Sequence, residues 1–270
     1  MQRLALALCL LSPLLARAAG APAGGTGKTE VTWLGHAAFV VRTPQGTVLA
    51  IDPWLANPSN PDRDSLAKLE RVDFILVSHG HFDHVGEAVA LAKKTGAKLV
   101  ATYELMAALV GAGYPKEQAT MATSGNVGGT LALSPEVTVT LAPAVHSSTF
   151  KKDEASPFEP AGSPVGFVLQ IRGGPTLYHT GDTAVTADMQ LLGDRFPVDV
   201  MLACIGGHFT MDPVGAAQAA RLVRAKVVVP MHYGTFPLLA GTPAELEAAL
   251  QKQGAKAKVV TMKPGETRSF

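Results

Sequence analysis

Charge and cysteine are both scarce in this sequence. Charged residues make up 17% of the 270 positions, and the formal net charge is only +1. Such a balance leaves no broad basic surface for a polyanion, so we expect no nucleic-acid partner. The two cysteines are too few for a disulfide framework, and a chain of this length can bury a large core without one.

An apolar run long enough for a membrane-spanning helix is also missing. The apolar start, from Leu4 to Leu15, is too short to cross a bilayer as a mature helix, so we expect no stable membrane insertion. It follows a basic start at 1–3 and precedes Ala16-Arg17-Ala18, whose small residues suit a signal peptidase. We predict a cleaved signal peptide over 1–19, rather than a buried N-terminal helix, and export to the periplasm or the extracellular space.

Cleavage of the predicted signal peptide would alter the net charge and remove one of the two cysteines. Residues 20–29 are rich in glycine and predict a flexible linker. Removing Arg3 and Arg17 leaves 21 basic and 22 acidic residues, a net charge near −1. Cys204 would be the only cysteine, so no internal disulfide could form. The folded part is then predicted to be one domain over 30–270.

The remaining sequence alternates apolar, strand-like runs with helical patterns, which indicates an α/β fold. Turn residues separate several of these runs, as at Pro44-Gln45-Gly46 and Gly173-Gly174-Pro175. Strands are predicted at 30–43, 47–51, 74–78, 98–102, 130–141 (as two antiparallel strands), 166–172, 176–179, 200–205, 226–231 and 258–262. Helices are predicted at 86–95, 104–111, 213–224 and 243–253.

Two stretches of the sequence follow the same plan. Val72–Val77 reads VDFILV and Val198–Ala203 reads VDVMLA; each precedes a His-Phe pair, an Ala-rich helical pattern and then AKLV or AKVV. This similarity predicts two pseudo-symmetric halves, each a sheet covered by helices, packed sheet against sheet with the helices outside. Residues 151–164 contain three prolines and fit no element, and such long loops are often functional.

Histidine is the residue type whose placement carries most information. Eight occur, three of them within 79–84. Nearly all follow a predicted strand, and binding sites built on sheets gather at the ends of strands. The histidines outside 79–84 are His36, His146, His179, His208 and His232.

The segment His79-x-His81-x-Asp83-His84 offers four metal ligands within six residues. It follows a buried strand, so the chain must turn, and alternate side chains can then converge on one ion while the others face a neighbouring ion. Imidazole and carboxylate suit Zn²⁺, Mn²⁺ or Fe²⁺, and two such ions can share a water or a carboxylate. The simpler interpretation is a polar turn in which Asp83 caps a helix, but four candidate ligands favour a metal site.

This segment, with the preceding Ser78, resembles the signature of the metallo-β-lactamase superfamily. The likeness extends from about Val31 to the C-terminus and favours one branch, the small single-domain metal-dependent hydrolases related to the ascorbate-phosphate lactonases. It implies an αββα sandwich of two mixed β-sheets with helices on the outer faces. The segments that carry it are WLGHAAF at 33–39, IDPW at 51–54, YHTGDT at 178–183 and MHYGTFP at 231–237.

The resemblance implies a complete dinuclear site. By matching positions, the first metal would be held by His79, His81 and His146, the second by Asp83, His84 and His232, and both by a bridging Asp182. The cofactors would then be two divalent ions, Zn²⁺ or Mn²⁺, with Fe²⁺ also possible, because these ligands accept several metals.

Four further polar residues are candidates for supporting roles. His36, Asp52 and His179 are expected behind the ligands, where they would fix the tautomer and orientation of the ligands; a purely structural hydrogen bond is the alternative. His208 stands where the resembled family usually carries another polar residue. It is a candidate to contact substrate or donate a proton, as is Asp83, or it merely caps the helix beginning near Asp212.

These features predict a metal-dependent hydrolase acting on a small-molecule substrate. Two cations would lower the pKa of a shared water and polarise the bond attacked, in an ester, lactone or phosphodiester. A nuclease of the same superfamily is disfavoured by the near-neutral charge, and a non-enzymatic metal-binding protein by the complete ligand set. A β-lactamase proper is disfavoured because the common dizinc type uses a cysteine ligand. The pocket wall is predicted to come from 54–60, 151–164 and 236–239.

Overall fold

The computed structural model describes residues 27–270. The predicted signal peptide (1–19) and most of the predicted linker (20–29) lie outside the described residues. The last linker residue, Thr29, is buried, and its carbonyl accepts a hydrogen bond from the Phe270 backbone N–H at 2.9 Å. Within 27–270, no helix is long and apolar enough to cross a membrane.

The first half of the chain, together with the C-terminal strand β16, forms a seven-stranded mixed sheet in the order β16-β1-β2-β3-β4-β5-β6. β1 to β3 are antiparallel neighbours, and β3 to β6 run parallel. The strands are β1 (Glu30–Trp33), β2 (Phe39–Arg42), β3 (Val48–Ile51), β4 (Phe74–Leu76), β5 (Lys98–Thr102), β6 (Ser124–Gly125) and β16 (Thr267–Ser269).

The second half forms another seven-stranded sheet in the order β15-β14-β13-β12-β11-β8-β7. Its strands are β7 (Thr130–Ala132), β8 (Val137–Pro143), β11 (Val165–Ile171), β12 (Thr176–His179), β13 (Val200–Cys204), β14 (Val227–Met231) and β15 (Lys258–Val259). Starting from β8, successive pairs are antiparallel, antiparallel and then parallel three times, as they are from β1 in the first sheet. The predicted pseudo-symmetry is therefore present in the strand topology.

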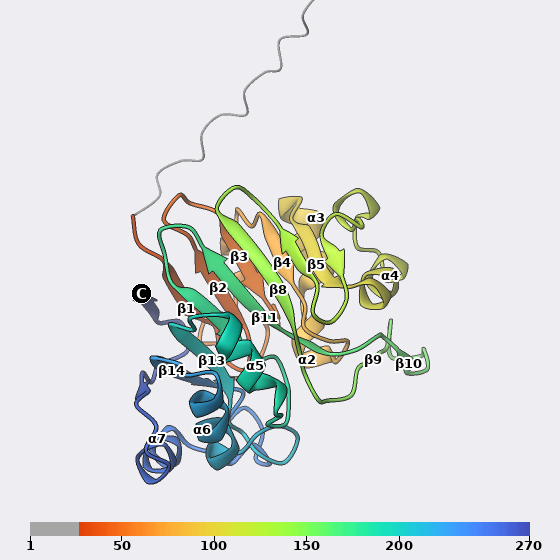
Figure 1. Ribbon diagram of the computed structural model, residues 1–270. Coiled ribbons are helices and arrows are strands. Elements are labelled where there is room, and N and C mark those ends of the chain that lie inside the picture. Colours follow the sequence, from red (N-terminus) through yellow and green to blue (C-terminus); the bar gives the residue numbers. More distant parts are fainter. Residues whose placement is uncertain (1–26) are drawn as a thin grey trace, which may run out of the picture.

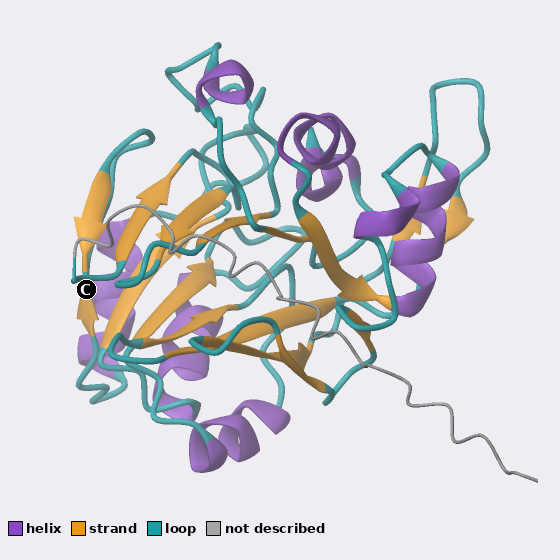
Figure 2. Cartoon of the chain, turned by 90° about the horizontal axis from the view of Figure 1, so that it is seen from above, coloured by secondary structure: helices purple, strands orange, loops and turns teal. Residues whose placement is uncertain are grey.

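Alternate side chains of the first sheet enter two different cores, as the period of two in a strand requires. Phe39 and Val41 face the second sheet, whereas Val40 between them faces the helices of the first half. In the next strand, Leu49 likewise faces the second sheet, and Ala50 faces the helices of the first half. The fold is thus the predicted αββα sandwich, with strands between two outer groups of helices (Figures 1 and 2).

The helices follow the strands of each half and cover the outer faces. α7 begins with a capping box in which the Thr242 side chain accepts from the Glu245 N–H and the Glu245 side chain accepts from the Thr242 N–H. α6 has Asp212 as its N-cap, so the cap is this carboxylate rather than His208. The helices are α1 (Ser65–Lys68), α2 (Phe82–Val85), α3 (Ala88–Thr95), α4 (Tyr103–Gly111), α5 (Asp188–Arg195), α6 (Pro213–Leu222) and α7 (Pro243–Lys252), with a 3₁₀ turn at Lys116–Gln118.

Three sequence predictions about elements are wrong in detail. The strand predicted over 30–43 is broken at 34–38, where Gly35 and His36 both have positive φ. The helix predicted over 86–95 is present as α3, which begins two residues later at Ala88, but the sequence missed the short α2 before it, which ends at its C-cap Gly86. The region 151–164 is not wholly irregular: β10 (Glu159–Pro160) pairs with β9 (Thr149–Phe150) as a separate hairpin, which projects beside α2 (Figure 1).

Candidate metal centre

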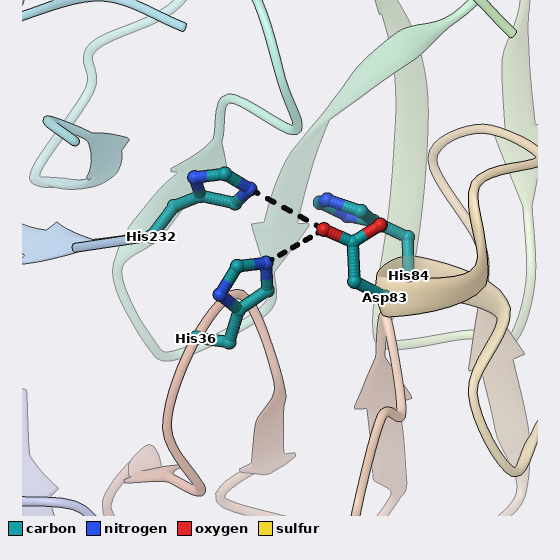
Figure 3. Close-up of side chains that lie close together, drawn as sticks. All are labelled: His36, Asp83, His84 and His232. Carbon is teal, nitrogen blue, oxygen red and sulfur yellow. Dashed lines mark hydrogen bonds and ion pairs between the residues drawn. The ribbon is translucent and has the colours of Figure 1, made fainter. Parts of the chain in front are cut away.

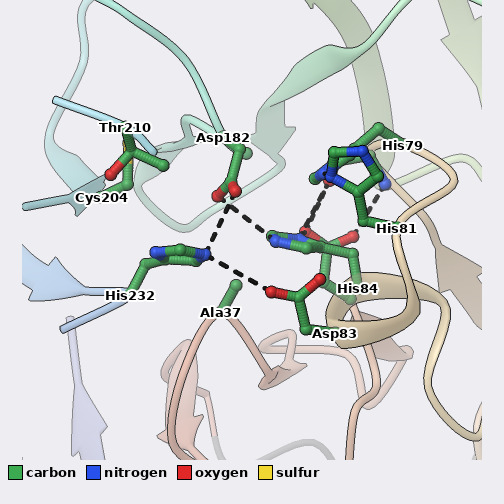
Figure 4. Close-up of polar contacts among 12 residues, drawn as sticks. Ala37, His79, His81, Asp83, His84, Asp182, Cys204, Thr210 and His232 are labelled. Atoms are coloured by element: carbon green, nitrogen blue, oxygen red, sulfur yellow. Dashed lines mark hydrogen bonds and ion pairs between the residues drawn. The ribbon is translucent and has the colours of Figure 1, made fainter. Parts of the chain in front are cut away.

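The loops at one edge of the two sheets bring all seven predicted metal ligands together. Figure 4 labels all of them except His146. The motif residues follow β4 and enter α2, while the other ligands follow β8, β12 and β14. Both halves of the molecule therefore contribute ligands. Their order along the chain is His79, His81, Asp83 and His84 from the first half, then His146, Asp182 and His232 from the second.

One group of imidazoles consists of His79, His81 and His146. One ring nitrogen from each lies within 4.8 Å of the other two. His79 Nε2 and His81 Nδ1 are 2.9 Å apart, so these two nitrogens point at the same small volume. This is the first ligand set that the sequence predicted.

A second group, beside the first, contains Asp83, His84, His232 and His36 (Figure 3). His36 Nε2 lies 3.0 Å from Asp83 Oδ2, and His232 Nε2 lies 3.8 Å from the same oxygen. The first three residues form the predicted second ligand set. The structure adds the ring nitrogen of His36, which is as close to Asp83 as any predicted ligand.

Asp182 stands between the two groups (Figure 4). Its Oδ1 lies 3.3 Å from His84 Nε2, while its Oδ2 lies 3.1 Å from His232 Nε2 and 3.6 Å from His146 Nε2. The preceding Gly181 has φ +58, and a Cβ there would lie 2.6 Å from the Val165 carbonyl oxygen. Glycine thus permits the tight turn that brings this carboxylate between both sets of imidazoles.

Unpaired buried atoms in this cluster fit a metal site. His84 Nε2, Asp182 Oδ1 and both ring nitrogens of His232 are buried without a hydrogen bond among the described residues, although the two Nε2 atoms lie within ion-pair distance of Asp182. Buried polar atoms are normally satisfied, because leaving one unpaired costs about 1–3 kcal/mol. Neutral imidazoles and carboxylates aimed at a common space are suitable donors for divalent cations. The residues present therefore fit the metal ions that the sequence implied.

Asp52 and His36 each touch a predicted ligand directly. Asp52 Oδ2 accepts hydrogen bonds from Ser78 Oγ at 2.7 Å and from His84 Nδ1 at 2.8 Å. The opposite ring nitrogen of His84 is thereby directed at Asp182. His36 binds Asp83 through Nε2 and Thr235 Oγ1 through Nδ1, both at 3.0 Å. These contacts are those expected of residues that orient metal ligands.

His179 contacts the backbone near the ligands rather than a ligand side chain. Its ring lies 3.0 Å from the Ala37 carbonyl through Nε2, and Nδ1 accepts from the Gly181 N–H at 3.1 Å. It thus fixes the backbone beside Asp182 rather than contacting a ligand side chain. Its Nε2 must carry the proton, because the carbonyl can only accept.

Strained backbone is concentrated at this edge of the sheets. Five non-glycine residues of the described chain have positive φ, and four of them are His36, Asp52, His208 and His232. This conformation costs about 1 kcal/mol or more for each such residue and persists where surrounding contacts enforce it. Its concentration here supports a functional site at the strand ends.

Burial and neighbouring charges shift the titration of the cluster in opposite directions. Burial lowers the pKa of His36 to about 4 and holds that of His79 well below its usual value. Burial also opposes charging of His232, but Asp182 and Asp83 outweigh it and raise its pKa to about 9. Burial disfavours ionisation of Asp182 too, yet His232 and His84 hold its pKa well below the usual range. The cluster without metal therefore retains protons beside two carboxylates.

His208 lies outside the three groups of metal-ligating atoms found among the described residues. Its ring packs edge-on against Phe209, with centroids 4.4 Å apart, and makes no hydrogen bond within 27–270. A catalytic role for His208 stays a prediction. The next residue, Phe209, lines the cavity over the ligand cluster.

A cavity of about 520 Å³ opens onto the ligand cluster. Of the predicted wall segments, 151–164 contributes Phe158, and 236–239 contributes Phe236 and Leu239. The prediction of 54–60 is wrong: Trp54 packs behind Phe82 and Phe236, and Asn57 is buried with its side chain bonded to backbone carbonyls. Sequence reasoning missed Phe82 and Phe209, although each follows a histidine of the repeated His-Phe pair.

Comparison with known proteins agrees with this geometry. Residues 30–232 match the family model described as "Beta-lactamase superfamily domain". The chain is 60% identical over 250 residues to a UPF0173 metal-dependent hydrolase of Anaeromyxobacter sp. (strain K), covering 92% of this chain and 89% of that protein. It is 54% identical over 251 residues to another from Myxococcus xanthus (strain DK1622), covering 93% and 87% respectively.

A solved structure shows the same fold. Igni18, a metallo hydrolase from the archaeon Ignicoccus hospitalis, superposes with a TM-score of 0.77 at 35% identity, covering 90% of this chain and 98% of that one. The chain belongs to the metallo-β-lactamase superfamily, and within it to the UPF0173 metal-dependent hydrolases. It is accordingly a metal-dependent hydrolase.

Proposed function

We propose that the protein uses two divalent metal ions and a water molecule to hydrolyse an ester, lactone or phosphodiester bond in a small molecule. The observation that carries this proposal is the position of Asp182 between two groups of metal-ligating side chains. His79, His81 and His146 would hold one ion, and Asp83, His84 and His232 the other. When bound, such ions lower the pKa of water and polarise the bond that it attacks.

The protein's own groups orient the site and handle protons. Asp52 and His36 fix His84 and Asp83, so little rearrangement is needed during reaction. Asp83 also lines the cavity, and the Oδ2 atom of Asp83 is hydrogen-bonded to His36 Nε2. Its Oδ1 is then the oxygen that would exchange a proton with the leaving group.

Metal content and substrate screening test the proposal directly. Purified protein should contain close to two divalent ions per chain, measured by elemental analysis. Esters, lactones and phosphodiesters are then assayed with Mn²⁺ and Zn²⁺ added separately. His79→Ala and Asp182→Ala should abolish turnover while far-ultraviolet circular dichroism stays unchanged; a variant with full activity would exclude this mechanism.

We also propose that the protein is exported and that nucleic acid is not its substrate. The support is the basic start, apolar run and small residues at 1–18, and the nearly balanced charge of the whole chain. Fractionation of the producing cell should place the protein outside the cytoplasm, with a mature N-terminus near residue 20 by terminal sequencing. An unprocessed cytoplasmic protein would refute export, and rapid cleavage of DNA or RNA would refute the second claim.

A further inference from the structure

The exposed phenylalanines of the described chain all gather at one place. Three phenylalanine side chains are mainly solvent-exposed: Phe82 at 69%, Phe158 at 72% and Phe209 at 55%. All three line the 520 Å³ cavity over the metal-ligand cluster. Single exposed apolar residues are ordinary, but rings that converge on one cavity mark a surface that an apolar group covers.

These rings come from four separate segments of the chain. Phe82 belongs to α2, Phe158 precedes β10, Phe209 follows β13, and the partly exposed Phe236 follows β14. Trp54 supports two of them from behind, stacked on Phe236 at 5.9 Å and edge-on to Phe82 at 5.5 Å between centroids. The apolar wall is therefore assembled by the tertiary fold and braced by a further ring.

No lysine or arginine is found among the described residues that line this cavity. Its polar groups are Ser147, Thr149 and members of the ligand cluster. Lys151 and Lys152 line the adjoining cavity, together with Asp153 and Glu154, so the charges there balance. The ammonium of Lys151 lies 5.7 Å from the centroid of the Phe158 ring, where the two cavities meet, but no lysine or arginine of residues 27–270 lines the cavity beside the ligand cluster. A phosphate or carboxylate placed beside the cluster would lack a basic side-chain partner, and burying an unpaired charge is costly.

We propose that this site selects uncharged carboxylic esters, cyclic or open, with an apolar acyl or aryl group that lies against Phe82, Phe158, Phe209 and Phe236. The proposal rests on the hydrolase function proposed above and narrows its substrate class to uncharged, apolar molecules. In the reaction, water adds across the acyl C–O bond, giving a carboxylic acid and an alcohol. The apolar group contributes affinity through the area that it buries.

Binding is tested without relying on turnover. N-phenyl-1-naphthylamine, an uncharged aromatic dye, is titrated into the metal-loaded protein and again after chelation, with dye fluorescence as the readout. Phe158→Ser and Phe209→Ser should each weaken binding about tenfold, because each removes a ring from the wall. Phe209→Leu should retain most of the affinity.

Two exposed apolar residues elsewhere provide matched controls. Met121 is 78% exposed and Leu191 67% exposed, and neither lines the cavity. Met121→Ser and Leu191→Ser should therefore leave dye binding unchanged. If these controls weaken binding as much as the phenylalanine variants, or if no variant does, the proposed apolar site is refuted.

Substrate selection is tested with 4-nitrophenyl acetate, 4-nitrophenyl butyrate and bis(4-nitrophenyl) phosphate. kcat/KM should rise about tenfold from acetate to butyrate, since two more methylene groups are buried. This gain should shrink in Phe158→Ser and persist in Met121→Ser. Equal values for the two esters, or faster cleavage of the anionic phosphodiester, would overturn the proposed selectivity.

The two proposals fail differently. Metal-loaded protein that cleaves none of these compounds would refute the proposed ester and phosphodiester hydrolysis, and dye binding would then decide the apolar site by itself. Turnover of the phosphodiester with no dye binding would support the hydrolase and refute the apolar selectivity.

Discussion

At the scale of single residues, the His232 imidazole is a group in the ligand cluster that stays protonated when no metal is bound. Its pKa of about 9, raised by Asp182 and Asp83 against burial, means that the ring is charged at neutral pH. A metal ion needs the neutral ring, so binding must displace this proton. His84, whose pKa is raised well above its usual value, behaves in the same way.

We predict that metal binding releases at least about one proton per chain at pH 7.5. The sign follows from the raised pKa: the proton is bound below pH 9 and already lost above it, so apparent metal affinity rises with pH and levels off above about 9. Titration calorimetry in buffers of different ionisation enthalpy measures the release. No proton release at pH 7.5, or affinity that decreases toward pH 9, would contradict this account.

The role of His36 can be separated from its unusual backbone. His36→Asn keeps a residue type that tolerates positive φ but loses the ring that reaches Asp83 and Thr235. Loss of such an orienting partner should weaken metal binding about 10- to 100-fold, measured by competition with a chromogenic chelator.

His208→Asn is the matched control for this prediction. His208 has nearly the same φ as His36, +54 against +53, but lies outside the ligand groups. Its substitution should leave metal affinity unchanged. Equal losses in the two variants would show that backbone strain, rather than the His36 side chain, determines affinity.

At the scale of elements, Gly86 separates α2 from α3 and so sets the direction of the ligand-bearing turn. It has φ +41, and a Cβ would lie 2.3 Å from Trp54 Cα and 2.6 Å from the Pro53 carbonyl oxygen. Gly86→Ala should lower the free energy of unfolding by about 3 kcal/mol, because backbone on both sides must move. Chemical denaturation of the metal-free protein measures it.

Gly111, at the end of α4, is the contrasting position. Its φ is not positive, and no atom lies within 4 Å of the place that a Cβ would occupy. Gly111→Ala should raise the free energy of unfolding by about 0.5–1 kcal/mol, since alanine restricts the unfolded chain. If both glycine variants shift stability in the same direction, steric crowding at Gly86 is not the decisive factor.

At the scale of the whole molecule, the predicted metal ligands come from both halves. Four of them precede β5 and three follow β8, so ions bound as proposed would connect the sheets through the chain's own side chains. With free metal at a thousand times Kd, binding stabilises the folded state by about 4 kcal/mol per site. Two sites together give about 8 kcal/mol, so chelation should lower Tm by about 20 °C in differential scanning calorimetry.

Asp182→Asn provides the control for this stability prediction. The bridging position would no longer carry a negative charge, so the Tm of the variant should respond much less to chelator. A wild-type Tm that is insensitive to chelation would contradict a structural contribution from the metal ions.

The sequence alone determined the αββα architecture, and it predicted the residues that the fold then brings together as candidate metal ligands. Continuous apolar runs, such as those at 48–51 and 200–204, mark strands buried on both faces, and the repeated VDFILV and VDVMLA segments indicate two similar halves. Four ligands within 79–84 lie close together because they are close in the chain. The signature that they form located the remaining ligands by resemblance.

Only the tertiary structure decided which side chains surround these ligands. The break at 34–38 turns His36 toward Asp83, although 47 residues separate the two in sequence. The phenylalanine wall likewise joins segments as distant as Phe82 and Phe236, and Trp54 supports it from behind rather than lining it. Such contacts depend on how loops pack across the two sheets, which local periodicity does not specify.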